Sequence, residues 1–252
     1  MQNPYKVKLK ALNLPYKTIL GTASAKTVKG EKIGYLTAIV YLKPSIKICP
    51  LSKLAGCLDP CLQSAGRGAF NSVIAARESK TRFYFENPEA FLLSIAADIW
   101  TLCNTASNKM LFPLVRLNGT SDICYENLIV CDDKNIFQLF PDVQFYDYTK
   151  HPGRSIEGKA PGNYDLTYSF SGITPKNVSI KGLLNPSNSR AAVVFQRQAD
   201  IPSNFRGWVT IDGDNTDVRH IEPKGVVVAL YAKGKAKRDY SGFTQIKGRD
   251  YA

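Results

Sequence analysis

Seven apolar segments, separated by stretches with helical patterning, constrain the fold of this chain most strongly. They are rich in β-branched and aromatic residues and lie at residues 33–42, 111–117, 143–148, 164–170, 191–196, 208–211 and 226–231. Helical patterning occurs at residues 70–81, briefly at 135–140, and from Asn87-Pro88 onward, where Asn suits the N-cap and Pro the first helical position. Strands that alternate with helices favour a mostly parallel sheet covered by helices. We therefore predict a single α/β domain, a complete or partial β/α barrel, with an open doubly wound sheet as the alternative.

The two ends of the chain differ from this pattern. Residues 1–30 are polar and rich in lysine, which predicts an irregular N-terminal arm or a β-hairpin, and residues 31–252 are expected to form the barrel-like domain with a basic C-terminal tail. No apolar run reaches the roughly 18 residues that cross a bilayer. The N-terminus begins with positive charge but has no apolar stretch behind it, unlike a secretory signal. We expect a cytoplasmic protein with no membrane partner, in the host cell cytoplasm if the origin is viral.

The net charge of +12 predicts an anionic partner. Such a charge attracts polyanions at long range, so a nucleic acid or a nucleotide is the first partner to consider, and a merely soluble basic protein is the alternative. A tyrosine at a strand end could stack on a base, and arginines or lysines after strands could hold phosphate. The residues selected for nucleic-acid binding are Tyr148, Arg154, Arg219, Lys233, Lys235 and Lys237.

Three cysteines on one short loop form the strongest local signal for chemistry. Cys49, Cys57 and Cys61 follow the first predicted strand within thirteen residues, and two prolines and a glycine shape the loop between them. In a reducing compartment such a cluster favours metal ligation over disulfides. Zinc would need a fourth ligand, and the two histidines, His151 and His220, are distant in sequence.

Three thiolates with one open position suit a four-iron cluster whose fourth iron binds a small molecule. A loop with this role after the first strand of a barrel is the arrangement of radical S-adenosylmethionine enzymes, although the spacing here, seven and three intervening residues, departs from the usual one. A [4Fe–4S] cluster with S-adenosylmethionine, a zinc ion, and three buried structural thiols all remain open.

Polar residues gather where the predicted strands end. In β/α barrels the residues just past the carboxyl end of each strand face the active site. The alternatives are capped turns, because Asn-Gly and Ser-Asp are turn chemistry, and carboxylates paired with a neighbouring arginine. The residues selected for catalysis are Asp122, Asp147 and Lys150, and those for cofactor binding are Arg67, Asn118, Ser121, Glu126, Asp212 and Asp214.

An ordered series of motifs runs along the chain: CP…GC…C…AGRG…AR…KT, RLNGTSD…E, FYDYTK…R, NYDLTYS, VVF and DGD.TD.R…P.GVVV.L.AKGKA. This series resembles the gene-product-eighty-eight-like proteins, a phage-associated domain family. The resemblance extends from about residue 20 to residue 245. It implies a viral or mobile-element origin. It also implies that the cysteine loop and the strand-end clusters are features of the family, but it does not imply a reaction.

Three functional hypotheses follow. The first is an iron–sulfur, radical-SAM-like enzyme that acts on a nucleotide or nucleic acid. The second is a non-catalytic phage protein that binds nucleic acid, with structural zinc or bare thiols. The third is a DNA-base-modifying barrel enzyme without a redox cluster.

Overall fold

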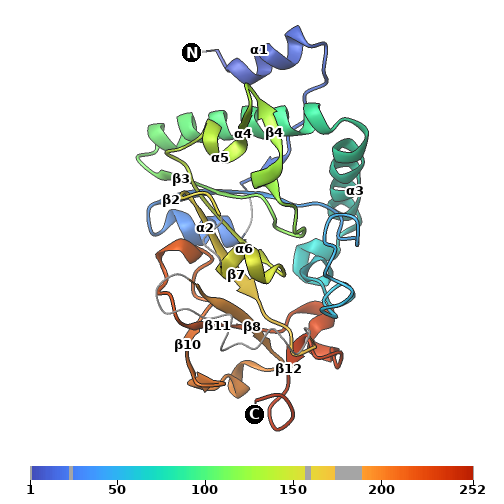
Figure 1. Cartoon of the computed structure of the whole chain (residues 1–252), viewed down its shortest axis with the longest axis vertical. Coiled ribbons are helices and arrows are strands. Elements are labelled where there is room, and N and C mark those ends of the chain that lie inside the picture. The colour runs from blue at the N-terminus through green and yellow to red at the C-terminus, as the bar shows by residue number, and fades with distance from the viewer. Residues whose placement is uncertain (1, 23–24, 157–159, 174–188, 252) are drawn as a thin grey trace.

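The predicted strands form one sheet in the computed structural model, which describes residues 2–22, 25–156, 160–173 and 189–251 (Figure 1). All seven predicted segments contain a strand. They are β2 (Tyr35–Val40), β3 (Phe112–Arg116), β6 (Gln144–Thr149), β7 (Tyr164–Ser169), β8 (Ala191–Phe195), β10 (Trp208–Asp212) and β11 (Val227–Tyr231). They lie side by side in the order β2-β3-β6-β7-β8-β11-β10, each parallel to its neighbour. The prediction of a mostly parallel sheet is therefore confirmed.

The edges of this sheet are antiparallel. β1 (Leu20–Gly21) pairs antiparallel with β2, and β9 (Asn204–Phe205) pairs antiparallel with β10. The described strands of the two edges do not pair with each other. The sheet is thus open, and the described residues do not form the complete barrel that was one of the expected outcomes.

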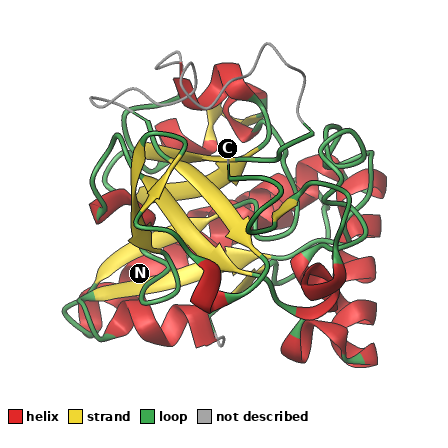
Figure 2. Cartoon of the chain, turned by 90° about the horizontal axis from the view of Figure 1, so that it is seen from below, coloured by secondary structure: helices red, strands yellow, loops and turns green. Residues whose placement is uncertain are grey.

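Helices surround the strands at the periphery of the molecule (Figure 2). The two predicted helices between β2 and β3 are α3 (Asn71–Glu86) and α4 (Pro88–Asn108), and the predicted short helix is α5 (Ile136–Leu139). A short helix, α6 (Pro152–Ile156), follows β6, and β4 (Ile129–Cys131) and β5 (Lys134–Asn135) form a separate hairpin. The 3-10 helices are η1 (Leu62–Ser64), η2 (Gly66–Ala69), η3 (Tyr125–Asn127), η4 (Gln198–Asp200), η5 (Arg219–Ile221) and η6 (Gly234–Arg238).

Helix α4 carries the largest share of the core. Phe91, Leu93, Ile95 and Ile99 are fully buried and belong to the apolar cluster between this helix and the sheet. By length and composition α4 could also cross a membrane, but 67% of its most apolar window is buried inside the protein. Its apolar character is accounted for by its position as the core helix.

Residues 1–30 differ from the prediction of an arm or hairpin. They contain α1 (Pro4–Ala11), β1 and α2 (Ala25–Glu31). The side chain of Asn3 caps α1, because its Oδ1 accepts hydrogen bonds from the amides of Tyr5 (3.1 Å) and Lys6 (3.2 Å). Leu9 is the buried residue of α1 and joins the main core, which attaches the helix to the rest of the fold.

The two faces of the sheet have different characters. Phe145 of β6 belongs to the apolar cluster with α4, whereas Tyr148 and Lys150, at the end of the same strand, line a cavity on the opposite face. The segment between β10 and β11 lies against this second face, where Val218 packs on Leu114 and Tyr146. One face is therefore covered by helices, and the other carries smaller apolar clusters and the cavity.

The predicted basic tail is part of the sheet. β12 (Thr244–Gln245) pairs parallel with the last residues of β8, Val194 and Phe195. β7 pairs with β8 only at the preceding residues, Ala191 and Ala192. The end of the chain thus lies beside β8 where the pairing of β7 with β8 stops.

Candidate active site

A cavity of about 350 Å³ opens at the carboxyl ends of the parallel strands. Its walls come from the cysteine loop after β2, the turn after β3, the end of β6, and the segments that follow β10 and β11. The carboxyl ends of parallel strands are where α/β proteins place their ligands, because loops from several strands meet there. This cavity is therefore the candidate active site.

The three cysteines of the predicted metal loop all line this cavity. The loop is held by its own polar groups: the amide of Cys57 donates to the carbonyl of Ser52 (3.0 Å), and Ser52 Oγ donates to the carbonyl of Cys49 (2.6 Å). Gly56, just before Cys57, has φ +64°, and a Cβ there would lie 2.5 Å from Ser241 Oγ. This turn therefore requires glycine. The other three cysteines, Cys103, Cys124 and Cys131, do not line the cavity.

The environment of Cys49 and Cys57 favours the protonated form of each thiol. Burial raises the pKa of Cys49 to about 12, with Asp122 and the other two thiols acting in the same direction and Lys150 opposing them. Burial likewise raises the pKa of Cys57, and Lys150 again opposes. The described residues contain no group of three or more His, Cys, Asp or Glu side chains that could hold a metal ion. Convergence of the three sulfurs on one ion is therefore not confirmed.

Lys150 lies on the same wall as the thiols. It is 6% exposed, and its Nζ donates to the carbonyls of Ser169 (2.7 Å) and Phe170 (3.3 Å) and lies 4.6 Å from the centre of the Phe243 ring. Burial lowers the pKa of the ammonium, while Cys57, Cys49 and Asp122 raise it. Lys150 thus presents a buried cation to the cysteine loop.

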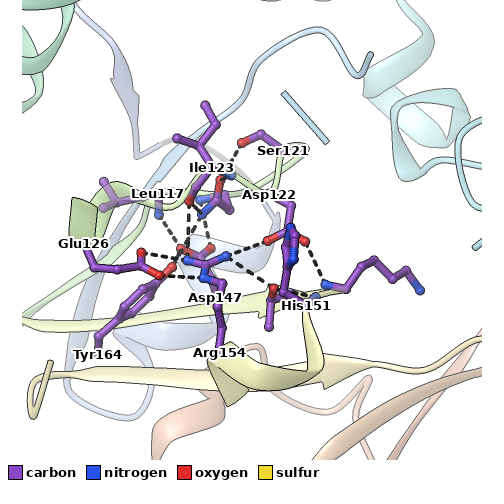
Figure 3. Close-up of polar contacts among 12 residues, drawn as sticks. Leu117, Ser121, Asp122, Ile123, Glu126, Asp147, His151, Arg154 and Tyr164 are labelled. Carbon is purple, nitrogen blue, oxygen red and sulfur yellow. Dashed lines mark hydrogen bonds and ion pairs between the residues drawn. The ribbon is translucent and has the colours of Figure 1, made fainter. Parts of the chain in front are cut away.

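The turn after β3 is internally hydrogen-bonded (Figure 3). Asn118 Oδ1 accepts from Ser121 Oγ (2.8 Å) and from the amide of Ile123 (2.8 Å). Asn118, Ser121 and Asp122 were predicted to be site residues, and all three line the cavity. Asn118 and Ser121 nevertheless direct polar groups at each other, which agrees with the capped-turn alternative.

Arg154 has its charge neutralised by two carboxylates (Figure 3). Its Nε and Nη2 donate to the two oxygens of Glu126 at 2.6 and 2.8 Å, and its Nη1 donates to Asp122 Oδ1 at 2.7 Å. Asp122 Oδ2 accepts from the amide of Lys150 (2.7 Å). Arg154 and Glu126 do not line the cavity. Arg154 thus connects α6 to the turn after β3 and is not available to a nucleic-acid phosphate.

Asp147 lies behind the site. It is fully buried, and its carboxylate accepts hydrogen bonds from the amides of Leu117 (3.1 Å) and Asn118 (2.9 Å) and from Tyr164 Oη (3.0 Å). Burial raises its pKa to about 7, although Arg116 and the hydrogen bonds favour the charged form. Asp147 does not line the cavity, so it does not contact a ligand held there in the way that the catalytic role predicted for it would require.

The tyrosine and arginine selected for nucleic acid contact each other. Tyr148 lines the cavity, but its ring lies under the guanidinium of Arg116, 4.7 Å away, and its hydroxyl accepts from Arg219 Nε (2.8 Å). Arg219 is fully buried and paired with Glu222. Arg219 therefore cannot meet a polynucleotide in this arrangement.

The remaining selected residues divide between the cavity and the surface. Lys233 and Asp214 form an ion pair that lines the cavity. Lys235 and Lys237 are exposed on η6, where contact with nucleic acid stays a prediction. Asp212 and Arg67 are exposed and do not line the cavity, so neither contacts a ligand held there.

Sequence reasoning missed Arg116, Lys29 and Asp217, which all line the cavity. Arg116 is the last residue of β3, so the rule that strand ends face the site could have found it. Asp217 lies close to Arg116 (3.4 Å), an arrangement that only the folded chain reveals.

A family model described as Gene product 88 matches residues 17–246. No curated protein and no solved structure matches the chain.

Proposed function

The chain belongs to the Gene product 88 family, and we propose from this premise that it is an iron–sulfur enzyme acting on a nucleotide or nucleic acid. In this proposal Cys49, Cys57 and Cys61 bind a [4Fe–4S] cluster, and the adjoining cavity receives S-adenosylmethionine and the substrate. One observation carries the proposal: three cysteines from the loop after the first parallel strand line the same cavity as the strand-end polar residues. The cavity lies at the carboxyl ends of several parallel strands, which supports a partial β/α barrel as part of this proposal.

Zinc and a four-iron cluster place different demands on the three thiols. Thiolates that share one zinc ion lie about 3.8 Å apart, because each Zn–S bond is about 2.3 Å long and the geometry is tetrahedral. The described residues contain no set of three donors able to hold a single ion, which counts against zinc in this arrangement and is not itself support for a cluster. In a four-iron cluster each cysteine binds a different iron, so its sulfurs are farther apart. Neither His151 nor His220 lines the cavity, which leaves three thiols and an open position.

The residues around the loop suit this role. Lys150 supplies a cation beside the thiols, and its charge lowers the pKa of Cys49 and Cys57 against the effect of burial, which favours the thiolate that binds metal. The Asp122–Arg154 pair and the amide of Lys150 fix the wall on which that cation lies. When bound, the cluster would supply one electron to a cofactor at its open iron.

Anaerobic purification followed by iron and sulfide analysis tests the proposal. We expect a brown protein with absorbance near 400 nm and about four irons per chain, in keeping with a [4Fe–4S] cluster. Cys57→Ser should abolish most of the iron. Cys103→Ser is the matched control, because Cys103 is also half-buried but lies on α4, outside the cavity. A colourless protein with stoichiometric zinc, or iron that Cys57→Ser leaves unchanged, would refute the cluster.

The net charge favours a second candidate, a non-catalytic nucleic-acid-binding protein. A Cys57→Ala variant separates the two candidates. If it loses metal and melts at a lower temperature but binds nucleic acid as the wild type does, the loop is structural and the second candidate holds. A DNA-base-modifying barrel enzyme without a redox cluster would instead keep its activity in metal-free protein.

A further inference from the structure

Arg116 is buried and Arg154 is half-buried, and their guanidinium groups are used differently. Arg154 makes three charge-assisted hydrogen bonds to carboxylates at 2.6 to 2.8 Å. Arg116, 4% exposed, makes one hydrogen bond to the described residues, from Nη1 to Asp217 Oδ2 at 3.4 Å. Its Nε lies 3.4 Å from Asp147 Oδ1 and has no hydrogen-bond partner. A buried guanidinium with five N–H donors is stabilised when those donors are satisfied. Arg116 lines the cavity and makes one long hydrogen bond, so its guanidinium retains donors for a ligand held there.

The cations that line the cavity outnumber the available carboxylates. Four lining side chains are cations, Lys29, Arg116, Lys150 and Lys233, and three are carboxylates, Asp122, Asp214 and Asp217. Asp122 is already paired with Arg154, which lies outside the cavity. Lys29 donates to the main-chain carbonyl of Asp214, and among the described residues no carboxylate lies within ion-pair distance of its ammonium. Lys29 and Lys150 thus bring positive charge to the cavity, and neither forms an ion pair with a carboxylate of the described residues.

The size and depth of the site select a small ligand. A volume of about 350 Å³ is that of a small-molecule pocket. Arg116 lies on the floor, at the end of β3, with the Tyr148 ring 4.7 Å from its guanidinium. A duplex cannot bring a backbone phosphate to a side chain that is 4% exposed.

We propose that Arg116 binds an oxyanion of a small ligand, the phosphate of a free nucleotide, at the floor of this cavity. Guanidinium N–H groups bind phosphate oxygens through paired, charge-assisted hydrogen bonds, and Lys29 and Lys233 add positive charge at the same cavity. The nucleoside part of this assignment rests on the proposed function. The oxyanion part rests on the single long hydrogen bond of the Arg116 guanidinium and on the positive charge of Lys29 and Lys150 at the same cavity.

Isothermal titration calorimetry of the full chain at low salt tests this inference. The probes are the four deoxynucleoside monophosphates, the four deoxynucleosides and S-adenosylmethionine. We expect at least one monophosphate to bind, its nucleoside to bind much more weakly, and inorganic phosphate to compete. Arg116→Gln should weaken nucleotide binding about 10- to 100-fold, and Arg116→Lys should weaken it less. Arg82→Gln, an exposed position on α3, is the charge-matched control and should bind as the wild type does.

Circular dichroism and thermal unfolding of each variant separate lost binding from lost folding. Phosphate competition in the wild type gives an answer that needs no variant. Equal binding of nucleotide and nucleoside, unchanged binding by a folded Arg116→Gln, or no binding of any monophosphate would overturn the inference. Binding of S-adenosylmethionine alone, weakened by Arg116→Gln, would place a carboxylate on Arg116 and overturn the phosphate assignment. Iron content reports on the proposed function separately, because Arg116→Gln should retain the iron of the wild type.

Discussion

Asp147 connects two strands and the turn that forms the cavity wall. Its carboxylate accepts from the amides at positions 117 and 118 and from Tyr164 Oη, and no part of it is exposed to solvent. Alternate residues of a strand point to opposite faces, so Asp147 and Lys150, three positions apart, belong to different faces of the sheet. The period of two along β6 thus separates Asp147 from Tyr148 and Lys150, although Thr149, which has the same parity as Asp147, also lines the cavity. Strand-end position alone could not make this distinction.

The protonation of Asp147 should give stability a specific pH dependence. Burial raises its folded-state pKa to about 7, whereas an unfolded Asp titrates near 3.9. Between these values the folded protein retains a proton that the unfolded chain has lost. The free energy of unfolding should therefore fall as pH rises from about 4 to about 7, by at most about 1.4 kcal/mol per pH unit, and then level off. Urea unfolding across this range should show that Asp147→Asn removes this slope. Equal slopes in both proteins would contradict the assignment.

The turn after β3 depends on close approach to the end of β2. The amide of Gly119 donates to the carbonyl of Val40 (3.0 Å), and a Cβ at position 119 would lie 2.6 Å from that oxygen and 2.7 Å from Ile39 Cγ2. Both neighbours are buried, so they cannot move aside easily. Glycine is therefore a steric requirement of this cavity wall.

Gly119→Ala should lower the free energy of unfolding by about 1–3 kcal/mol, because the added methyl group overpacks a buried contact. Gly162→Ala is the control, since a Cβ there would have no neighbour within 4 Å. It should change stability by less than about 0.5 kcal/mol. Chemical denaturation of both variants provides the comparison. Equal stability of the two variants would show that the turn adjusts.

Sequence patterns predicted the elements that bury an apolar surface and missed those fixed by polar contacts. Most of the seven strands and α4 were evident from their apolar residues. β10 was found from its aromatic and β-branched residues, although none of its residues is buried. Helix α1 has one buried residue, Leu9, so its periodicity carries little information. Its Asn3-Pro4 start nevertheless has the same pattern as Asn87-Pro88, from which α4 was predicted. At α1 the asparagine side chain caps the helix, whereas at α4 it makes no capping hydrogen bond.

Closure of the sheet is a property of the whole molecule and could not be predicted locally. The first and last parallel strands can pair with each other only if no other strand already pairs with their outer edges. Here the edges carry β1 and β9, two residues each, which no pattern of apolar residues could reveal. The cavity follows the same logic: its position at the strand ends was predicted, but the contribution of Arg116 and Asp217 required the folded chain.

The net charge of +12 predicts salt-dependent binding of single-stranded DNA by the surface. The exposed Lys235 and Lys237 of η6 are the expected contacts. Fluorescence anisotropy between about 50 and 200 mM salt should show affinity falling linearly on a logarithmic scale. Replacing both lysines by glutamine should reduce the slope by about one to two. The matched control replaces Lys6 and Lys10, which are exposed on α1. Salt-independent affinity, or no binding at low salt, would contradict this prediction.

The segment that follows β11 completes the cavity, since Lys233, Ala236 and Phe243 form part of its wall and β12 pairs with β8. During synthesis on the ribosome, the cysteine loop emerges long before this wall exists. The nascent chain therefore exposes its thiols to the cell, and any cluster or ligand that the cavity encloses can be enclosed only after residues 233–245 have been translated. A message truncated before this segment would yield a chain with the cysteines and most of the sheet but with an open site.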